Sequence, residues 1–572
     1  MTTKSLLRFF ALFEFAFSAH AANAPAWKWE PSLVPRALVV EGLWSDFFRI
    51  EPAMHSAGLL SQHAYISRSP YFGGYSRLYN LPKDAELNRF SVIVIANLDA
   101  PTLNAERLGA VREFVAQGGG LVVLGGYWAY SRGAYDGTAL AEMLPVTFPP
   151  ENRIPPNRDG LPLHPAPQAT WKMAFDFAAK PGAFYVQALV PKAGATVQLL
   201  AGEKPAMISG TFGKGRVVAC ALTANGDPPQ GVLPFWDWPD FPKLLGHAVD
   251  WAAGARPLAA DVASATTKPV LSEDEMNSLA LGSGVTPEMA RRICERPDRQ
   301  TADALLSHVM RPEGGGKVDL ASAYRALLPF AKAEWGVMLR GSLEKFSPDI
   351  KGRQAGLILL GASKDPAAYA IIHDAVQRET AKDAAIEAFG WLGNSDAIPL
   401  LRELLARAES ACNAMATDDE PAPDVFAHKQ GSTIVEAAIS LHRLGDPEAV
   451  PRLLQVYRRV RLYDRIFHNA TKRRVYETDV QGVGILRRLH EGAEKLAAAL
   501  ARLREQAGPV PESQRAAFIR SAMEATDPAE VEWLCLALEQ SASSVPAAAW
   551  QPLTKARDGI IARMAAALVN GH

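Results

Sequence analysis

Cysteine is scarce in this sequence, with four copies in 572 residues, and none of them forms a Cys-x-x-Cys pair. That scarcity excludes a disulfide framework and a zinc or dithiol site built on such pairs. An excess of one charge is lacking as well, because 60 lysines and arginines face 61 aspartates and glutamates. A chain without a basic excess has no overall electrostatic attraction for nucleic acid, so we expect no nucleic-acid partner. We also expect no cofactor and no metal site.

Long apolar runs are missing too, since no stretch after the first residues approaches the roughly 18–20 residues needed to cross a bilayer. At the start, Lys4 and Arg8 precede the short apolar run Phe9–Phe17, and Ala19–Ala21 or Ala22–Ala24 offers a small-residue cleavage pattern. This order is typical of a signal peptide. We predict a signal over residues 1–24 and an exported protein, periplasmic or extracellular, with no transmembrane segment after signal removal. The alternative is a disordered N-terminus.

What the first half does contain is a series of short apolar runs separated by a helical pattern. The order of strand, helix and strand, with strands apolar throughout, indicates a parallel sheet covered on both faces. We predict a doubly wound α/β domain over residues 36–256, with a helix over 104–115 capped at Thr102. The expected strands are 36–40, 91–96, 121–124, 197–200, 206–210 and 215–222. Seven prolines between Pro149 and Pro167 predict a wrapping loop with no inner strand.

Several segments of this half resemble the class I glutamine amidotransferase-like domain, over about Arg36–Arg256. The resemblance rests on Gly118–Trp128, Tyr135–Pro145, Gly213–Ala219, Pro234–Trp238 and His247–Trp251. It implies a flavodoxin-like sheet, a cysteine nucleophile on the sharp turn after the central strand, and a histidine and a glutamate on a later strand.

The residues needed for that chemistry are absent. The matching turn, Gly125–Trp128, has no cysteine, and Cys220 lies inside an apolar strand. No His-x-Glu occurs in the later half of the domain. Without a thiolate there is no acyl-enzyme route to ammonia, so we expect no glutaminase activity and no catalytic residue.

The carboxyl edge of such a sheet is where ligands bind. We expect it to gather carboxylates, an amide, a guanidinium and aromatic rings, a mixture suited to sugars: Glu41, Trp44, Asn97, Asp99, Tyr127, Trp128, Tyr130 and Arg132. Two interpretations stay open, a small carbohydrate-binding pocket and a vacant pocket filled by its own aromatic side chains. Glu41 and Asp99 could in principle act as a general acid/base pair.

The second half changes to helical periodicity, with a linker and helical region over residues 257–350 and repeats over 351–572. A Leu-Gly phrase followed by aspartate recurs at Leu360–Pro366, Leu392–Asp396 and Leu444–Pro447, and more weakly at Asp527-Pro528. Glycine allows a left-handed helix stop, aspartate caps the next helix, and proline suits its first turn. The aspartates of these phrases are unevenly spaced along the chain, which predicts insertions at 409–429 and 458–479.

The recurring phrase resembles HEAT-type repeats, including those of phycobilisome lyase-like proteins, over roughly Lys351–Leu538. Only the fold carries over, because no residue here matches lyase chemistry. The resemblance implies an all-α superhelical solenoid; the alternative is a non-repeating helical bundle.

Basic residues cluster in the second predicted insertion, interleaved with aromatic residues. We consider two interpretations, a solvated face and a patch for an anionic partner, formed by Arg458, Arg459, Arg461, Arg465, Lys472, Arg473 and Arg474.

Together these features predict an exported, non-catalytic binding or scaffold protein, a pseudoenzyme whose solenoid docks a protein or an anionic envelope polymer. The alternative function is a carbohydrate-active or sugar-processing enzyme that uses carboxylates at the sheet edge.

Overall fold

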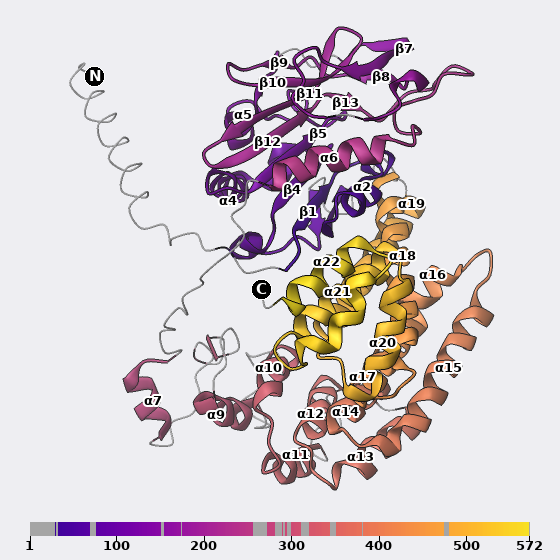
Figure 1. Ribbon diagram of the computed structural model, residues 1–572. Helices are drawn as coiled ribbons and strands as arrows, with labels where there is room; N and C mark the ends of the chain where they lie inside the picture. Colours follow the sequence, from indigo (N-terminus) through magenta and orange to yellow (C-terminus); the bar gives the residue numbers. More distant parts are fainter. Residues whose placement is uncertain are drawn as a thin grey trace. The chain divides into compact units, whose positions relative to one another are not determined.

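A computed structural model describes residues 29, 33–68, 76–149, 154–172, 174–254, 271–280, 289, 292–293, 299–309, 320–343, 350–379, 381–473 and 480–570. The chain divides into two compact units, Met1–Ala64 with Leu81–Ala263 and Tyr65–Asn80 with Ser264–His572. In Figure 1 the strands run from indigo to magenta and the later helices from orange to yellow. The predicted signal peptide lies outside the described residues.

The described strands form one mixed sheet of eleven members in the order β13-β8-β7-β10-β11-β12-β5-β4-β1-β2-β3, and a second sheet that pairs β6 with β9. The strands are β1 (Arg36–Glu41), β2 (Leu60–Arg68), β3 (Ser76–Tyr79), β4 (Val92–Ala96), β5 (Gly120–Leu124), β6 (Val146–Thr147), β7 (Pro156–Pro165), β8 (Gly182–Val186), β9 (Val190–Pro191), β10 (Thr196–Ala201), β11 (Lys204–Phe212), β12 (Gly215–Cys220) and β13 (Leu222–Thr223).

The centre of the sheet is parallel and apolar. β4 pairs in parallel with β1 and β5, and β12 pairs in parallel with β5. Every residue of β4 and β5 is buried, as expected of strands covered on both faces. Helix α6 (Phe241–Ala253) packs against β5 and β12, and a Cβ atom at Gly120 would lie 2.6 Å from the Ala252 carbonyl carbon. Glycine therefore allows the close approach of helix and strand.

Shorter helices complete the α/β unit. They are η1 (Ser45–Phe48), α2 (Ile50–Ser56), η3 (Asp84–Arg89), α3 (Ala100–Leu103), α4 (Ala105–Ala116), α5 (Ala139–Met143) and η4 (Phe177–Ala179). The predicted helix over 104–115 is α4, but Asn104 caps it by accepting a hydrogen bond from the Arg107 N–H (3.0 Å). Thr102, the predicted cap, lies in α3.

The α/β fold is confirmed, with one difference in strand direction. The runs predicted as strands at 36–40, 91–96, 121–124, 197–200, 206–210 and 215–222 fall on β1, β4, β5, β10, β11 and β12. However, β7, β8, β10 and β11 pair antiparallel, so the sheet is mixed rather than parallel throughout.

The prediction that the proline-rich segment contains no inner strand was wrong. β7 lies between β8 and β10. Proline lacks an N–H but keeps its carbonyl, and the Pro162 oxygen accepts a hydrogen bond from the Gly202 N–H (2.9 Å). The pairing with β8 is interrupted between Pro156 and Leu161, so the strand tolerates its prolines by pairing intermittently.

The second unit is mainly helical. Its helices are α7 (Glu273–Ala280), α9 (Arg299–Val309), α10 (Leu320–Leu327), η5 (Leu328–Phe330), α11 (Trp335–Leu343), α12 (Ile350–Ala362), α13 (Ala368–Gln377), α14 (Lys382–Leu392), η6 (Ser395–Ala397), α15 (Ile398–Met415), α16 (Ala422–Val425), η7 (Phe426–Gln430), α17 (Gly431–Arg443), α18 (Ala449–Arg473), α19 (Val480–Glu505), α20 (Glu512–Glu524), α21 (Pro528–Ser541), η8 (Ala547–Lys555) and α22 (Gly559–Val569). None of the described helices is long and apolar enough to cross a membrane.

The repeated Leu-Gly phrase marks helix ends, although not always as predicted. Gly393 (φ 78°) and Gly445 (φ 75°) take the left-handed conformation that the phrase predicts. Gly361 instead lies inside α12, where a Cβ atom would come within 2.2 Å of the Ala388 carbonyl oxygen. There the left-handed residue is Lys364 (φ 57°). Glycine in the first copy of the phrase therefore serves helix packing.

Of the aspartates of the phrase, Asp527 caps a helix as predicted, whereas Asp365 and Asp446 accept hydrogen bonds in the turns that precede α13 and α18. Asp365, Asp446 and Asp527 accept hydrogen bonds from backbone N–H groups two residues later, at 2.9, 3.1 and 3.0 Å. At the second copy Asn394 accepts the bond from the Asp396 N–H (2.9 Å), so Asp396 is not the cap.

Each of these three aspartates also pairs with an arginine from earlier in the chain. The pairs are Arg340 with Asp365, Arg402 with Asp446 (2.6 Å) and Arg458 with Asp527 (3.4 Å). Each contact links one helix to the turn that precedes a later helix, so the same kind of polar connection recurs along the helical unit.

The two predicted insertions are largely helical. α15 runs on to Met415, and α16 and η7 follow after a short loop. α18 is continuous through Arg473. The longer spacing between phrases therefore comes from the longer helices α15 and α18, from the short turns α16 and η7, and from one additional helix, α19.

Candidate functional site

The turn after β5 is enclosed by side chains from neighbouring segments. Gly126 has a φ of 142°, and a Cβ atom there would lie 2.2 Å from the Asn97 side-chain carbon Cγ. On its other side the Gln187 amide donates a hydrogen bond to the Gly126 carbonyl oxygen (2.7 Å). Both Asn97 and Gln187 are buried. The turn where the amidotransferase resemblance implies a nucleophile is thus packed against two buried amide side chains.

Asn97 joins three loops at the carboxyl edge of the sheet. It follows β4 in a left-handed conformation (φ 47°). Its side-chain N–H donates to the Leu43 carbonyl oxygen, and its side-chain oxygen accepts from the Trp128 N–H (2.6 Å). Because Leu43 follows β1 and Trp128 follows β5, one buried amide fixes the loops after three parallel strands.

Beneath this edge, Tyr130 and Cys220 are fully buried. The Tyr130 hydroxyl donates to the carbonyl oxygens of Cys220 (2.9 Å) and Val123 (3.1 Å). Burial raises the pKa of the Tyr130 hydroxyl well above its ordinary value. Burial likewise raises the pKa of the Cys220 thiol to about 12, which keeps it protonated at neutral pH. Cys220 is therefore a packed thiol, as its apolar strand predicts.

The remaining aromatic residues of the predicted edge site are partly exposed. Tyr127 is 39% exposed, and Trp44 and Trp128 are half-buried. The Arg132 guanidinium lies 3.5 Å from the centre of the Tyr127 ring, and the rings of Tyr127 and Trp128 meet edge to face at 5.4 Å. Arg132 and Tyr127 thus contact each other, an arrangement that favours packing over ligand binding.

The two candidate carboxylates are also engaged by their neighbours. Glu41 accepts a hydrogen bond from the Ser45 hydroxyl (2.8 Å), and Asp99 accepts one from the Thr102 hydroxyl. Both carboxylates belong to buried residues. General acid/base chemistry needs carboxyl groups that reach a substrate, and this arrangement holds them inside the protein.

Sequence reasoning missed His63, which contacts one of these carboxylates. The His63 Nδ1 lies 2.7 Å from a Glu41 carboxylate oxygen, and its Nε2 lies 3.0 Å from the Ser61 hydroxyl. Ser61 and His63 are two residues apart on β2, so they share a face of the strand. Their spacing of two residues was the available sequence signal, because it places both on one face of a strand. Only the pairing of strands in the folded sheet brings them near Glu41.

The predicted basic patch does not form one exposed surface. Arg458 pairs with Asp527 and Glu530, Arg459 approaches Glu409 at 3.8 Å, and buried Arg461 pairs with Glu532 at 3.3 Å. Lys472 is buried, with its ammonium 5.0 Å from the centre of the Tyr65 ring. Arg465 is exposed. The side chain of Arg473 and all of Arg474 lie outside the described residues.

A hairpin from early in the chain belongs to the helical unit. Tyr65–Asn80 clusters with the helices, and its strands pair Tyr65 with Tyr79. On α19, His490 hydrogen-bonds to the hydroxyls of Ser67 (3.1 Å) and Tyr79 (2.9 Å). On α18, His468 stacks on the Tyr65 ring at 4.1 Å. These contacts between distant segments have no local sequence signal.

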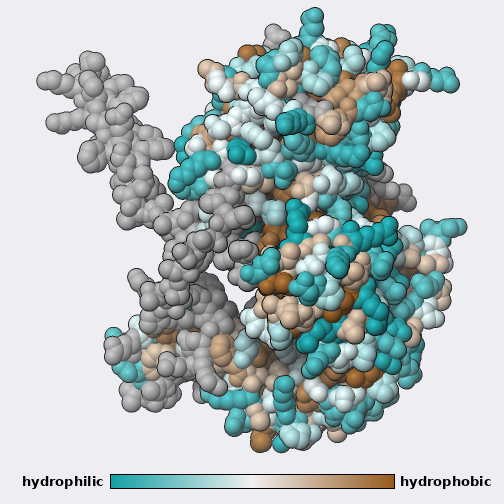
Figure 2. All heavy atoms as spheres, in the orientation of Figure 1, coloured by the Kyte–Doolittle hydropathy of each residue, from teal (hydrophilic) through white to brown (hydrophobic). Residues whose placement is uncertain are grey.

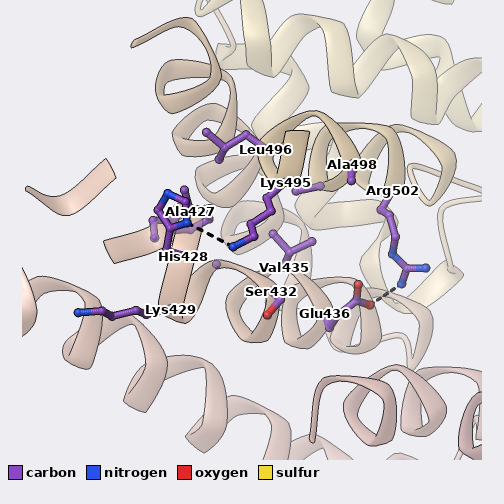
Figure 3. Close-up of a pocket in the computed structure, with 13 residues that line it drawn as sticks. Ala427, His428, Lys429, Ser432, Val435, Glu436, Lys495, Leu496, Ala498 and Arg502 are labelled. Atoms are coloured by element: carbon purple, nitrogen blue, oxygen red, sulfur yellow. Dashed lines mark hydrogen bonds and ion pairs between the residues drawn. The ribbon is translucent and has the colours of Figure 1, made fainter. Parts of the chain in front are cut away.

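The helical unit also contains a cavity of about 330 Å³ between η7, α17 and α19 (Figure 3). Its apolar lining consists of Phe426, Ala427, Val435, Leu496, Ala498 and Ala499. Its polar lining includes His428, Ser432, Glu436, Lys495 and Arg502. Figure 3 shows Lys495 reaching toward His428 at one end and Glu436 facing Arg502 at the other. Sequence reasoning did not find this site.

Comparisons with known families agree with this architecture. Residues 88–253 match the family model GATase1_like, which is described as "Putative glutamine amidotransferase". Residues 381–407 and 435–459 match the model of the PBS lyase HEAT-like repeat. The chain therefore combines an amidotransferase-like α/β domain with HEAT-like repeats, and both predicted resemblances are confirmed.

Two solved structures are similar to part of the chain. "Cytoplasmic Protein STM3548 from Salmonella typhimurium" is 19% identical, with a TM-score of 0.31, over 38% of this chain and 98% of that one. "Cytoplasmic Protein STM1381 from Salmonella typhimurium LT2" is 17% identical, with a TM-score of 0.29, over the same shares of 38% and 98%. No curated protein matches the chain.

Proposed function

We propose that this protein is an exported binding or scaffold protein whose amidotransferase-like domain does not hydrolyse glutamine. The observation that carries the proposal is the turn after β5. It has no cysteine, and Asn97 and Gln187 enclose it with hydrogen bonds. Because glutamine hydrolysis in this fold depends on an activated thiolate at that turn, a turn that lacks cysteine and is packed against buried amides supports a role other than glutamine hydrolysis.

A covalent probe tests the absence of a nucleophile. Full-length protein incubated with 6-diazo-5-oxo-L-norleucine, an electrophilic glutamine analogue, keeps its intact mass under this proposal. A stoichiometric adduct on any residue of the α/β unit would overturn it. Labelling only after unfolding, on a cysteine, supports the proposal because it reports a thiol that native packing protects.

The HEAT-like repeats support a protein partner, since stacked helices present extended binding surfaces. Leu462 (53% exposed) and Ile466 (42%) lie on one face of α18, and Ile485 (43%) lies on α19, which packs against α18. On the face drawn in Figure 2, hydrophobic residues occur in small groups among hydrophilic ones. Small apolar groups framed by charge are typical of contacts between proteins, and we place the partner surface at these three residues.

Matched surface variants test that placement. We expect Leu462→Asp combined with Ile466→Asp to lose a protein that immobilised wild type captures from the source cells. Val337→Asp is the control, because Val337 is 70% exposed on α11 and lies outside the proposed surface. A captured set that is identical for wild type and both variants would contradict the proposal for this surface.

Export is part of the proposal and rests on the N-terminal residues Lys4, Arg8 and Phe9–Phe17. When the full-length chain is expressed in a Gram-negative host, the protein should appear in the periplasmic or secreted fraction. Its mass should match that of a chain cleaved after Ala21 or Ala24. Uncleaved protein retained with the cytoplasmic fraction would contradict export.

A further inference from the structure

The cavity between η7, α17 and α19 is shaped by a π-helical turn. Residues Phe426–Gln430 form this turn immediately before α17. A π-turn inserts an extra residue into a helix and is frequent at functional sites. At Gly431, where α17 begins, a Cβ atom would lie 2.4 Å from the Phe426 carbonyl oxygen and 2.9 Å from its ring. Glycine therefore permits the turn that carries Phe426 and His428 into the cavity lining.

One end of the cavity opens at Lys495, an exposed cation that has no hydrogen bond to a carboxylate among the described residues. The Lys495 ammonium donates a hydrogen bond to the His428 Nδ1 (3.2 Å). Burial, together with the charges of Lys495 and Arg488, lowers the pKa of His428, so the imidazole is neutral at pH 7. Within the described residues, Lys495 hydrogen-bonds to this neutral ring and to no acidic group.

The opposite end is internally paired. Arg502 donates hydrogen bonds to Glu387 (3.0 Å) and to Glu436. Burial raises the pKa of Glu436 to about 7 despite this arginine. A second guanidinium, that of Arg443, lies 4.0 Å from Glu387 but does not line the cavity. Of the cations that do line it, Arg502 is paired with these two carboxyl groups and Lys429 with Glu420 (2.6 Å), so an anion in the cavity is directed to Lys495.

Between the two ends the walls are mainly hydrocarbon. Phe426 and Val435 are buried on η7 and α17, and Leu496, Ala498 and Ala499 face them from α19. An apolar body buries its surface against these residues favourably, whereas peptide N–H and C=O groups would find few partners. The lining thus favours an alkyl or aryl chain over a peptide.

We infer that this cavity binds a free aliphatic monocarboxylate of medium chain length, with its carboxylate at Lys495 and its chain along Phe426, Val435 and Leu496. The volume of about 330 Å³ accommodates on the order of ten heavy atoms at roughly 30 Å³ each. This inference is independent of the proposed protein partner, because the exposed residues of that surface do not line the cavity.

Isothermal titration calorimetry with octanoate on the full-length protein tests the inference, with octanamide as the uncharged analogue. We expect saturable binding of octanoate and at least about tenfold weaker binding of octanamide, because the charge-assisted hydrogen bond to Lys495 is lost. Lys495→Met should weaken octanoate by roughly the same factor and leave octanamide unchanged, since Met keeps the length and helix propensity of the side chain.

Arg487→Met is the matched control on the same helix, because Arg487 is exposed, pairs with Glu491 and does not line the cavity. It should bind octanoate as wild type does. Circular dichroism of each variant establishes that it folds. A second variant, Ala499→Phe, fills the cavity without altering charge and should abolish binding of both compounds. Three results would overturn the inference. Wild type could bind octanoate and octanamide with equal affinity, Lys495→Met and Arg487→Met could lose affinity for octanoate equally, or folded wild type could show no saturable binding.

Discussion

At the scale of single residues, buried polar side chains hold together the carboxyl edge of the α/β sheet. Asn97 supplies hydrogen bonds to the loops after β1 and β5, and Tyr130 bonds to the carbonyls of Val123 and Cys220. Buried polar groups stabilise a fold when each is paired, and they cost free energy when a partner is removed. The edge of the sheet is therefore sensitive to substitutions that leave these partners unpaired.

We predict that Asn97→Ala lowers the free energy of unfolding by about 2–4 kcal/mol, because it leaves the Trp128 N–H and the Leu43 carbonyl without their partner. Urea-induced unfolding measures the change. Asn225→Ala is the comparison, since Asn225 is exposed and bonds only the adjacent Gly226 N–H (2.9 Å); it should cost less than about 1 kcal/mol. An equal loss of stability in Asn97→Ala and Asn225→Ala would contradict the structural role that we propose for Asn97.

Cys220 should not react with iodoacetamide in the native protein. Its pKa of about 12 leaves little thiolate at pH 8, and the side chain is buried. Mass spectrometry after brief labelling should find Cys220 unmodified in the native protein and modified in urea. Rapid native labelling at Cys220 would show that the strand opens easily or that the thiol is activated.

At the scale of helices, the aspartates of the repeated phrase combine a hydrogen bond to the backbone of their own turn with an ion pair to an earlier helix. The buried Asp446 carboxylate accepts two hydrogen bonds from Arg402, at 2.9 and 2.6 Å, and one from the Glu448 N–H. Burial acts to raise the pKa of Asp446, but these hydrogen bonds outweigh burial and lower it. The charged form is thus stabilised in the folded state.

Asp446→Asn should cost about 1–3 kcal/mol at pH 7, because a charged, bidentate acceptor is replaced by a neutral one. The folded pKa lies below the unfolded value near 4, so the contribution is present above pH 4 and disappears as the pH falls through the folded pKa. The free energies of urea-induced unfolding of wild type and variant should therefore differ at pH 7 and converge in acid.

The control is Asp374→Asn, in the exposed pair with Arg378, which should change the free energy of unfolding by less than about 0.5 kcal/mol. A difference at Asp446 that persists in acid would contradict the ionic origin of the effect.

The helices and strands that could be predicted are those that a pattern in consecutive residues of the sequence indicates. Apolar runs located β1, β4 and β5, and left-handed glycines located the ends of α14 and α17. β7 was missed because its prolines pair intermittently through carbonyl groups. The basic residues of α18 gave a misleading signal, because their partners Glu530 and Glu532 lie some 70 residues later. The cavity was missed because the π-turn and α19 meet only in the folded helical unit.

At the scale of the whole molecule, an amidotransferase-like domain with no cysteine at the turn after β5 is joined to HEAT-like repeats. The helical unit includes a segment from early in the chain, Tyr65–Asn80, whose tyrosines contact His468 and His490. Neither unit, within the described residues, contains a cluster of side chains suited to a metal ion. HEAT-like repeats are typical of protein-binding surfaces, which agrees with the binding role that we propose.

Ammonia release from L-glutamine by purified full-length protein tests the central claim most directly. A coupled glutamate dehydrogenase assay should give a rate indistinguishable from protein heated to denaturation, since no thiolate stands at Gly125–Trp128. The opposite result is ammonia release in proportion to protein concentration, which persists after further purification and is abolished by substitution of a residue at the sheet edge. That result would contradict the account and would indicate that the α/β unit is an enzyme.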